Sequence, residues 1–109
     1  MGQLNGSEIL AKALKREGVE ELFFLMGGPM LTAEAATIQE GIRCIDVRHE
    51  QAAAMMAQAY SRLRQKPGFC MAASGPATIN LSTGLANALI DCCPVVALGG
   101  ASPMLGNGK

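Results

Sequence analysis

Four short runs with strand character alternate with helical stretches along this chain, and this alternation limits the fold more than any other feature. Residues 22–26 are apolar at every position, which is typical of a strand buried on both faces of a parallel sheet. Further strands are expected at 43–47, 69–73 and 94–98. A regular alternation of this kind predicts right-handed βαβ crossovers and an α/β, three-layer, doubly wound parallel sheet.

The helices are expected between these strands. Asn5 and Glu8 have the spacing of a capping box, which starts a helix that Gly18 ends. Helices should then cover 32–40, 49–66 and 78–91. We expect the last to be continuous and to pack closely through Gly84. On the helix at 49–66 we expect one buried apolar stripe. Its members are Ala52, Met56, Ala59, Tyr60 and Leu63.

The predicted sheet stops early. We expect one domain over residues 1–109, truncated after the fourth strand, at a point where another helix would normally follow. Such a sheet would leave one strand edge exposed.

Composition argues against several classes of protein. The 9 basic and 9 acidic residues balance and form no basic run, so nucleic-acid binding is not expected. No apolar stretch approaches the roughly 18 to 20 residues of a membrane span, and the first residues lack the pattern of a signal peptide, so neither a membrane span nor a signal peptide is expected. The sequence also lacks the glycine-rich motifs of nicotinamide and P-loop nucleotide sites.

The sulfur-containing residues are expected in the interior. The four cysteines, Cys44, Cys70, Cys92 and Cys93, have neither C-x-x-C spacing nor a neighbouring histidine cluster, so no metal site is expected. We interpret them as reduced, buried thiols of a cytoplasmic protein. Three methionines, Met26, Met55 and Met56, are expected to fill gaps in the core.

Three polar or glycine-containing segments should meet at one edge of the sheet. In open α/β sheets ligands bind beyond the carboxyl ends of the strands, where Gly27-Gly28-Pro29, His49-Glu50 and Gly75-Pro76 are expected. Each segment also has an ordinary explanation. The glycines suit tight turns, His49 suits a surface position, and Glu50 suits the first turn of a helix, where the dipole favours a carboxylate. The residues alone leave both interpretations open.

The run from Arg48 to Arg62 resembles the R-H-E-x-x-A-x-x-M-A-x-(G/A)-Y-(A/S)-R segment of thiamine-diphosphate enzymes of the acetolactate synthase, pyruvate oxidase and oxalyl-CoA decarboxylase group. Gly75-Pro76 through Asn80 resembles the G-P-G-x-x-N turn of that group. Residues 85–96 resemble its L-A-N-A-x-x-D-x-x-P-V-V run. The resemblance spans nearly the whole chain and implies the thiamine-diphosphate-binding fold.

The resemblance implies a function for the three segments at this edge of the sheet. The family's pyrimidine-binding domain grips the aminopyrimidine of the cofactor, and its catalytic glutamate corresponds to Glu50. A hydrogen bond from that glutamate to ring nitrogen N1′ favours the imino tautomer, which deprotonates the thiazolium. Decarboxylation or ligation of a 2-keto acid follows. Apolar neighbours would raise the pKa of Glu50 and the helix dipole would lower it, so the balance is open. The implied cofactor-binding residues are Gly27, Gly28, Glu50, Gly75, Pro76 and Asn80.

The resemblance also implies partners. Mg²⁺ and the diphosphate are held in this family by a separate C-terminal domain with a G-D-G…N motif, which has no counterpart in this sequence. FAD is present in some members and is left open here. A homodimer or tetramer is implied, because the family's glutamate reaches a cofactor held by the neighbouring subunit.

Two departures from the family pattern concern the site. The third position of the G-P-G turn is Ala77, whose methyl group is expected to crowd the pyrimidine. Gly99-Gly100-Ala101 replaces the family's Ser/Thr-Gly-Gln, so the glutamine expected near the substrate is missing. Acetolactate formation itself is therefore left open. The alternatives are a non-catalytic module of a truncated or split enzyme that binds a partner subunit, and a small flavodoxin-like nucleotide-binding domain.

Overall fold

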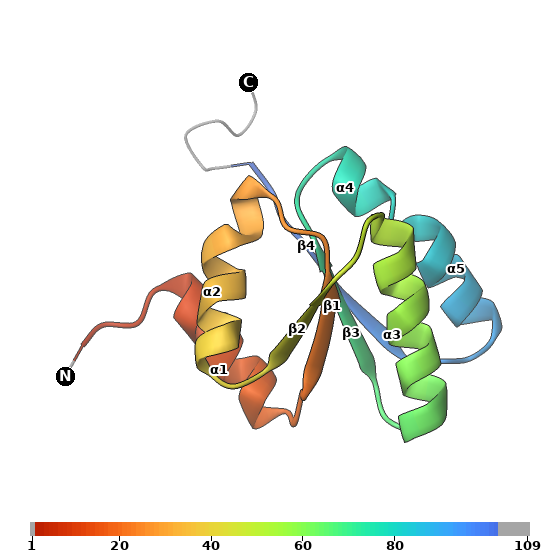
Figure 1. Cartoon of the computed structure of the whole chain (residues 1–109), viewed down its shortest axis with the longest axis horizontal. Coiled ribbons are helices and arrows are strands. Elements are labelled where there is room, and N and C mark those ends of the chain that lie inside the picture. Colours follow the sequence, from red (N-terminus) through yellow and green to blue (C-terminus); the bar gives the residue numbers. More distant parts are fainter. Residues whose placement is uncertain (1, 103–109) are drawn as a thin grey trace.

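The computed structural model describes residues 2–102, which form a four-stranded, all-parallel sheet with helices on both faces (Figure 1). The strand order is β2-β1-β3-β4. The strands are β1 Glu21–Phe24, β2 Arg43–Asp46, β3 Gly68–Ala72 and β4 Val95–Gly99. The helices are α1 Gly6–Arg16, α2 Leu31–Gln39, α3 Glu50–Arg64, α4 Pro76–Ile79 and α5 Ser82–Ile90, with a short 3₁₀ turn, η1, at Gly28–Met30.

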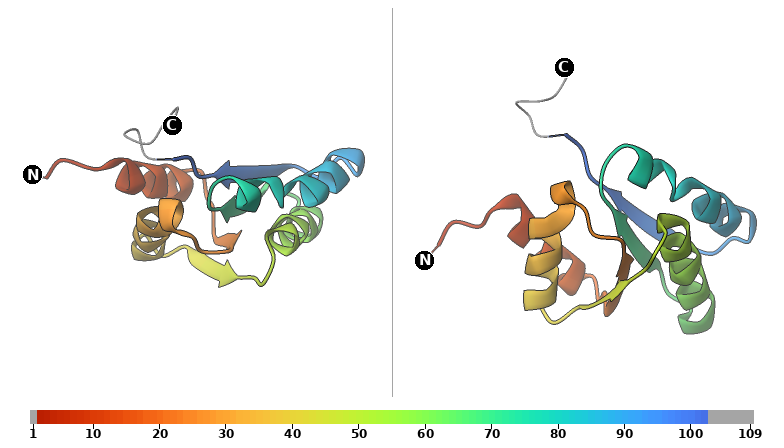
Figure 2. Two further views of the ribbon diagram at one scale, coloured as in Figure 1. Left: turned by 90° about the horizontal axis from the view of Figure 1, so that it is seen from above. Right: turned by 45° about the horizontal axis from the view of Figure 1, so that its top comes forward.

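The helices divide between the two faces of the sheet. Helices α1 and α2 cover one face, and α3, α4 and α5 cover the other, as both sets of views show (Figures 1 and 2). Adjacent strands β1 and β3 therefore send their chains to opposite faces, β1 into α2 and β3 into α4. This divergence is a topological switch point. The prediction of an α/β, three-layer, doubly wound parallel sheet is confirmed.

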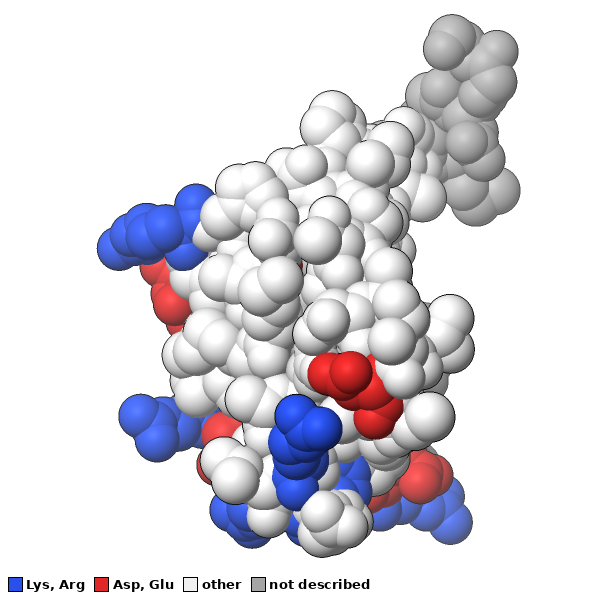
Figure 3. All heavy atoms as spheres, turned by 90° about the vertical axis from the view of Figure 1, so that its right-hand side faces the viewer, with Lys and Arg blue, Asp and Glu red and all other residues white. Residues whose placement is uncertain are grey.

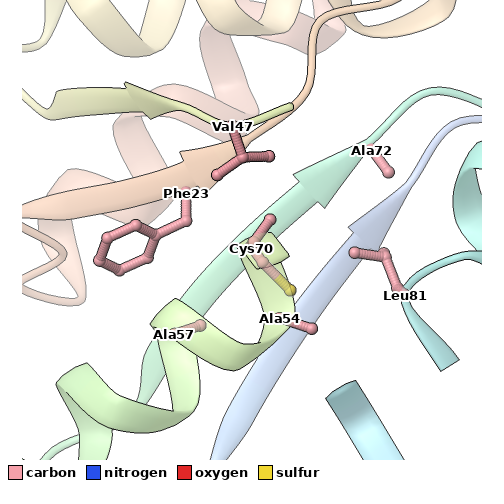
Figure 4. Packing of buried hydrophobic residues seen from close by; sticks show 8 residues of the cluster. Phe23, Val47, Ala54, Ala57, Cys70, Ala72 and Leu81 are labelled. Atoms are coloured by element: carbon pink, nitrogen blue, oxygen red, sulfur yellow. The ribbon is translucent and has the colours of Figure 1, made fainter. Parts of the chain in front are cut away.

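Each face of the sheet has its own apolar core, because side chains alternate along a strand. Phe23 belongs to the cluster on the α3 side together with Cys70 and Ala72 (Figure 4), and its ring lies edge-on to that of Tyr60 of α3, with ring centroids 6.1 Å apart. Leu22 and Phe24 belong to the cluster on the α1 and α2 side. The residues of β1 are thus buried on both faces, as the uniformly apolar run predicts.

Small residues let α3 lie close to the sheet. Its buried face includes Ala53, Ala54 and Ala57, which have no exposed surface. A β-carbon at Gly68, the first residue of β3, would overlap the carbonyl group of Ala57. Only glycine therefore fits at this crossing of helix and strand.

The expected helix at 78–91 is interrupted, so this prediction is wrong in detail. Residues 80 and 81 separate α4 from α5, although both keep right-handed helical angles. The amide of Leu81 donates to the carbonyl of Thr78 at 3.1 Å, three residues back, which tightens the chain locally. The Leu81 side chain is 1% exposed in the core, so the corner turns it inward.

The predicted apolar stripe of α3 is also wrong. Met56, Ala59 and Leu63 are exposed, while Ala52 and Tyr60 are partly buried. The methionines expected in the core lie at the surface: Met26 is 53% exposed, Met55 39% and Met56 38%. Alanines on its buried face let α3 lie close to the sheet, and longer side chains such as Met56 and Leu63 are left on the solvent side of the helix.

The cysteines divide in the same way. Cys70 is fully buried, Cys44 and Cys93 are partly buried, and Cys92 is exposed, contrary to the expectation that all four lie inside. Burial raises the pKa of the Cys70 thiol to about 11. Burial, together with the nearby Glu34 carboxylate, raises the pKa of Cys44 to about 11. All four are free thiols.

The described part of the sheet ends at β4, which pairs with β3 alone. Its residues are all exposed or partly buried, and Val96 is 40% exposed. This matches the exposed strand edge expected from the sequence. The remainder of the predicted tail, residues 103–109, lies outside the described part of the chain.

Candidate functional site

The turns that follow β1, β3 and β4 touch one another at the carboxyl edge of the sheet. A β-carbon at Gly27 would overlap the side chain of Ala73, which follows β3. A β-carbon at Gly100, which follows β4, would lie 3.0 Å from the β-carbon of Pro29 and 3.2 Å from the carbonyl oxygen of Ala73. The glycines thus permit a close meeting of three turns at the switch point.

The fourth turn, after β2, leads directly into α3. Its N-cap is His49, whose Nδ1 accepts a hydrogen bond from the Gln51 amide at 3.0 Å. This contact satisfies one of the free amides at the helix start. His49 therefore has a capping role in the fold, and Glu50 becomes the first residue of the helix.

Glu50 is a carboxylate with little access to solvent. Its residue surface is 9% exposed, although it stands at the rim of the domain. The Asn80 amide Nδ2 donates to Glu50 Oε1 at 3.0 Å, across 30 residues of sequence. No other side chain of the described residues donates to this carboxylate. One of its two oxygens is therefore held and the other has no side-chain partner.

The pKa of Glu50 lies below its ordinary value. The hydrogen bond from Asn80 is the largest cause, since it stabilises the ionised carboxylate, and burial acts in the opposite direction. A hydrogen bond at its own backbone and the nearby His49 lower it further. The balance that the sequence left open thus falls on the ionised side.

Two of the predicted cofactor-binding glycines have free space beside them. A β-carbon at Gly28 or at Gly75 would meet no atom within 4 Å. Gly75 has a φ of 59°, a left-handed conformation that favours glycine, and it turns the chain into Pro76, the first residue of α4. Gly27 differs, because its missing side chain is required by packing against Ala73.

The two departures from the family pattern have different structural consequences. Ala77 is partly buried and packs against the core on the α3 side, and the crowding of the pyrimidine by its methyl group stays a prediction. The backbone N–H of Gly100 donates to the Ala73 carbonyl at 2.8 Å, so backbone atoms alone form this part of the rim. No glutamine side chain stands at this position, as the sequence indicates.

The predicted site residues all lie in the turns and helix starts that follow β1, β2 and β3. Glu50 and Asn80 are in direct contact, and the turns at Gly27-Gly28 and Gly75-Pro76 flank the switch point. Among residues 2–102, no group of three or more His, Cys, Asp or Glu side chains is arranged to hold a metal ion. No helix in the same range is long and apolar enough to cross a membrane.

Comparison with known proteins assigns this arrangement to a family. Residues 4–108 match the family model described as "Thiamine pyrophosphate enzyme, N-terminal TPP binding domain". The chain belongs to this family. Thiamine pyrophosphate is the same compound as thiamine diphosphate, so the resemblance of the R-H-E and G-P-A-x-x-N segments is confirmed at the level of the family. The rim described above is that of a thiamine pyrophosphate enzyme domain.

Relatives of this thiamine pyrophosphate enzyme domain carry two kinds of name. The chain is 44% identical over 99 residues to acetolactate synthase, chloroplastic, of Arabidopsis thaliana, covering 90% of the chain and 15% of that protein. It is 42% identical over 105 residues to the acetolactate synthase isozyme 2 large subunit of Escherichia coli, covering 94% and 19%. It is 40% identical over 100 residues to human 2-hydroxyacyl-CoA lyase 1, covering 92% and 17%. The chain thus spans less than a fifth of the length of these relatives.

Proposed function

We propose that this chain is the cofactor-activating part of a thiamine-diphosphate-dependent enzyme of the acetolactate synthase type, which decarboxylates or ligates 2-keto acids, with Glu50 as its catalytic residue. One observation carries the proposal. A shielded carboxylate stands at the rim next to the switch point, with one oxygen held by Asn80 and no side-chain partner for the other. A ring nitrogen of an aminopyrimidine is a suitable partner for that second oxygen.

The residues of the rim fit a flat aromatic ring. Gly28 and Gly75 offer backbone with open space where a side chain would otherwise stand, and Pro76 adds an apolar surface. We assign Gly27, Gly28, Gly75, Pro76 and Asn80, with Glu50, to the pyrimidine-binding site. Gly27 contributes indirectly, by letting the turn after β1 lie against Ala73.

The bound cofactor supplies the electron sink on which 2-keto acid chemistry depends. The chain's own contribution is to hold a proton at Glu50 and to keep the carboxylate away from water. Because the pKa of Glu50 is lowered, the carboxylate is ionised at neutral pH before the ring binds. A ring nitrogen that carries no hydrogen is also only an acceptor, so one proton has to be taken up from solvent when the ring binds, and Glu50 and the ring nitrogen then share it.

Following the resemblance to the family, we propose that Mg²⁺ and the diphosphate are held by a separate domain. We assign no residue of this chain to the binding of FAD. The two names carried by the relatives, acetolactate synthase and 2-hydroxyacyl-CoA lyase, are compatible with different second substrates. The missing glutamine at Gly99-Gly100-Ala101 supports a second substrate different from that of acetolactate synthases.

We further infer assembly into a homodimer or tetramer. The outer surface of α3, α4 and α5 carries large apolar side chains in contact with solvent, and Figure 3 shows this side of the molecule as largely uncharged except at its lower end and along its left edge. An exposed apolar surface of this kind is typical of an interface. The main members of this surface are Met55, Met56, Leu63, Ile79, Leu89 and Ile90.

The free thiols support a reducing compartment, and we place the protein in the cytoplasm.

The proposal is tested by turnover of pyruvate in the full-length polypeptide that contains these residues. Wild-type protein should consume pyruvate only when thiamine diphosphate and Mg²⁺ are added. Glu50→Gln keeps the shape of the side chain but cannot share a proton in the same way, so turnover should fall about 100-fold or more. Undiminished turnover in Glu50→Gln would refute the role of Glu50. Absence of any cofactor-dependent turnover of 2-keto acids by wild-type protein would refute the proposed function itself.

A further inference from the structure

We propose that Asn80 is a positioning residue for Glu50, whose amide confines the catalytic proton to Oε2 and fixes that oxygen for the ring nitrogen. This inference rests on the proposed function and goes beyond the assignment of Asn80 as one more cofactor-binding residue. It starts from the 3.0 Å hydrogen bond that Asn80 Nδ2 donates to Glu50 Oε1.

The chemistry of the amide decides which oxygen carries the proton. An amide nitrogen only donates hydrogen bonds and does not release its proton at ordinary pH. A proton on Oε1 would occupy one of its lone pairs and make that oxygen a weaker acceptor for the N–H of Asn80. The proton that Glu50 shares therefore belongs on Oε2. A second carboxylate or a histidine at position 80 would exchange protons and remove this selectivity.

The corner between α4 and α5 directs Asn80 toward Glu50. The Thr78 hydroxyl donates to the Ala73 carbonyl at 2.7 Å and ties α4 to the end of β3. The backbone N–H of Asn80 donates to the Pro76 carbonyl at 2.9 Å, which completes the single turn of α4. The next residue, Leu81, is buried in the core and anchors the far side of the corner. The position of Asn80 is thus set on both sides.

Two close contacts keep this corner in place. A β-carbon at Gly99 of β4 would lie 2.7 Å from the Thr78 methyl group, so β4 supports α4 directly. A β-carbon at Gly84 of α5 would lie 3.2 Å from the carbonyl oxygen of Gln51, in the first turn of α3. Asn80 and Glu50 are therefore carried by elements that pack tightly against each other, which preorganises the carboxylate before any ligand binds.

The test follows the titration of Glu50 in this chain without cofactor, by NMR of the labelled side-chain carboxyl carbon. Glu50→Gln assigns the signal. Asn80→Ala removes the donor, and the titration midpoint should rise by about half to one pH unit. Asn80→Asp keeps the shape but replaces the donor by a like charge, so the midpoint should rise further. Asn87→Ala is the matched control, because Asn87 donates to Gln58 on α3, away from Glu50. Its midpoint should equal that of the wild type.

An unchanged midpoint in Asn80→Ala would overturn the proposal. If Asn80→Ala does not fold, as judged by circular dichroism, the titration midpoint of Glu50 in Asn80→Asp is the test, because the side chains of Asn and Asp have the same shape. An unchanged midpoint in Asn80→Asp would then overturn the proposal. A second measurement uses the full-length polypeptide with cofactor. A positioning role predicts that Asn80→Ala lowers kcat about tenfold or more while the Kd for thiamine diphosphate stays near the wild-type value. A raised Kd with unchanged kcat would assign Asn80 to cofactor binding alone and refute positioning.

These outcomes are separable from those of the proposed function. The carboxyl titration needs no cofactor and no substrate. If Glu50→Gln abolishes turnover while Asn80→Ala leaves the titration unchanged, the function stands and the role of Asn80 falls. If the titration shifts and Glu50→Gln leaves turnover intact, the hydrogen bond is structural and the catalytic assignment falls.

Discussion

Gly84 of α5 lies so close to Ala54 of α3 that a β-carbon at position 84 would overlap the Ala54 methyl group. This contact brings two helices that are distant in sequence together near the start of α3, where Glu50 stands. The sequence predicts close packing at Gly84, and the structure identifies the partner. The stability of the domain and the geometry of its candidate site therefore depend on the same contact.

Enlarging residue 84 should destabilise the domain. Gly84→Ala forces α5 away from α3, and the free energy of unfolding should fall by about 1–3 kcal/mol, although alanine is the better helix former. Chemical denaturation monitored by circular dichroism measures this. Ser82→Ala on the exposed face of the same helix is the control and should change stability by less than about 0.5 kcal/mol. Equal stability of Gly84→Ala and wild type would show that the helices can separate without cost.

The two glycines after β1 should respond differently to the same substitution. Gly27→Ala would overlap Ala73 and should cost about 1–3 kcal/mol of folding stability. Gly28→Ala meets open space and should cost less than about 1 kcal/mol. In the full-length polypeptide, Gly28→Ala should instead weaken binding of thiamine diphosphate, measured by calorimetry. If Gly28→Ala binds the cofactor as wild type does, Gly28 does not line the ring.

Glu34 should make the stability of the chain depend on pH. One of its oxygens is buried without a hydrogen-bond partner, and the pKa of Glu34 is raised by burial and by the nearby Asp46. As pH rises from the unfolded toward the folded pKa, the unfolded state loses its proton first. The free energy of unfolding therefore falls across that window and stays reduced at higher pH.

Replacing Glu34 should recover this lost stability. Glu34→Gln cannot ionise, so at neutral pH it should be more stable than wild type by about 1 kcal/mol. The gain should vanish below about pH 4, where Glu34 is protonated in both states. Glu17→Gln, at an exposed position, is the control and should show no such pH-dependent gain. A gain that persists unchanged in acid would mean that charge is not its cause.

The thiols should react in the order of their exposure. Cys92 is exposed and should be alkylated first by iodoacetamide, whereas Cys70 is fully buried with a pKa raised to about 11 and should react last. Mass spectrometry of peptides after timed labelling gives the order. In denaturant all four cysteines should react at similar rates. Labelling of Cys70 as rapidly as Cys92 in the native chain would contradict the packing of β3 described here.

The strand pattern predicts the fold well because burial on both faces of a parallel sheet leaves a local signal. The apolar run at 22–26, which overlaps β1, and the glycine and proline turns after β1 and β3 are visible in the sequence itself. The buried face of α3 is not predicted correctly. Hydrophobicity alone favours Met56 and Leu63 for the core, whereas close helix packing selects the small residues Ala53 and Ala57.

The site is predicted in part for a similar reason. The R-H-E segment singles out Glu50 as a candidate, and its place just after β2 at the carboxyl edge follows from sheet topology. The hydrogen bond from Asn80 has no local signal, since its partners are 30 residues apart and meet only through the corner between α4 and α5. The N-cap role of His49 could have been suspected from its position before the first helical residue, although histidine is an unusual cap.

The central claim is that Glu50 promotes removal of the proton from the thiazolium ring of the cofactor. The most direct measurement is the rate at which the C2 hydrogen of thiamine diphosphate exchanges with deuterium in the full-length polypeptide, followed by NMR after rapid quenching. The account predicts that wild-type protein accelerates exchange over free cofactor and that Glu50→Gln, with cofactor still bound, slows it about 100-fold or more. Equal exchange rates in the wild type and in cofactor-loaded Glu50→Gln would contradict it.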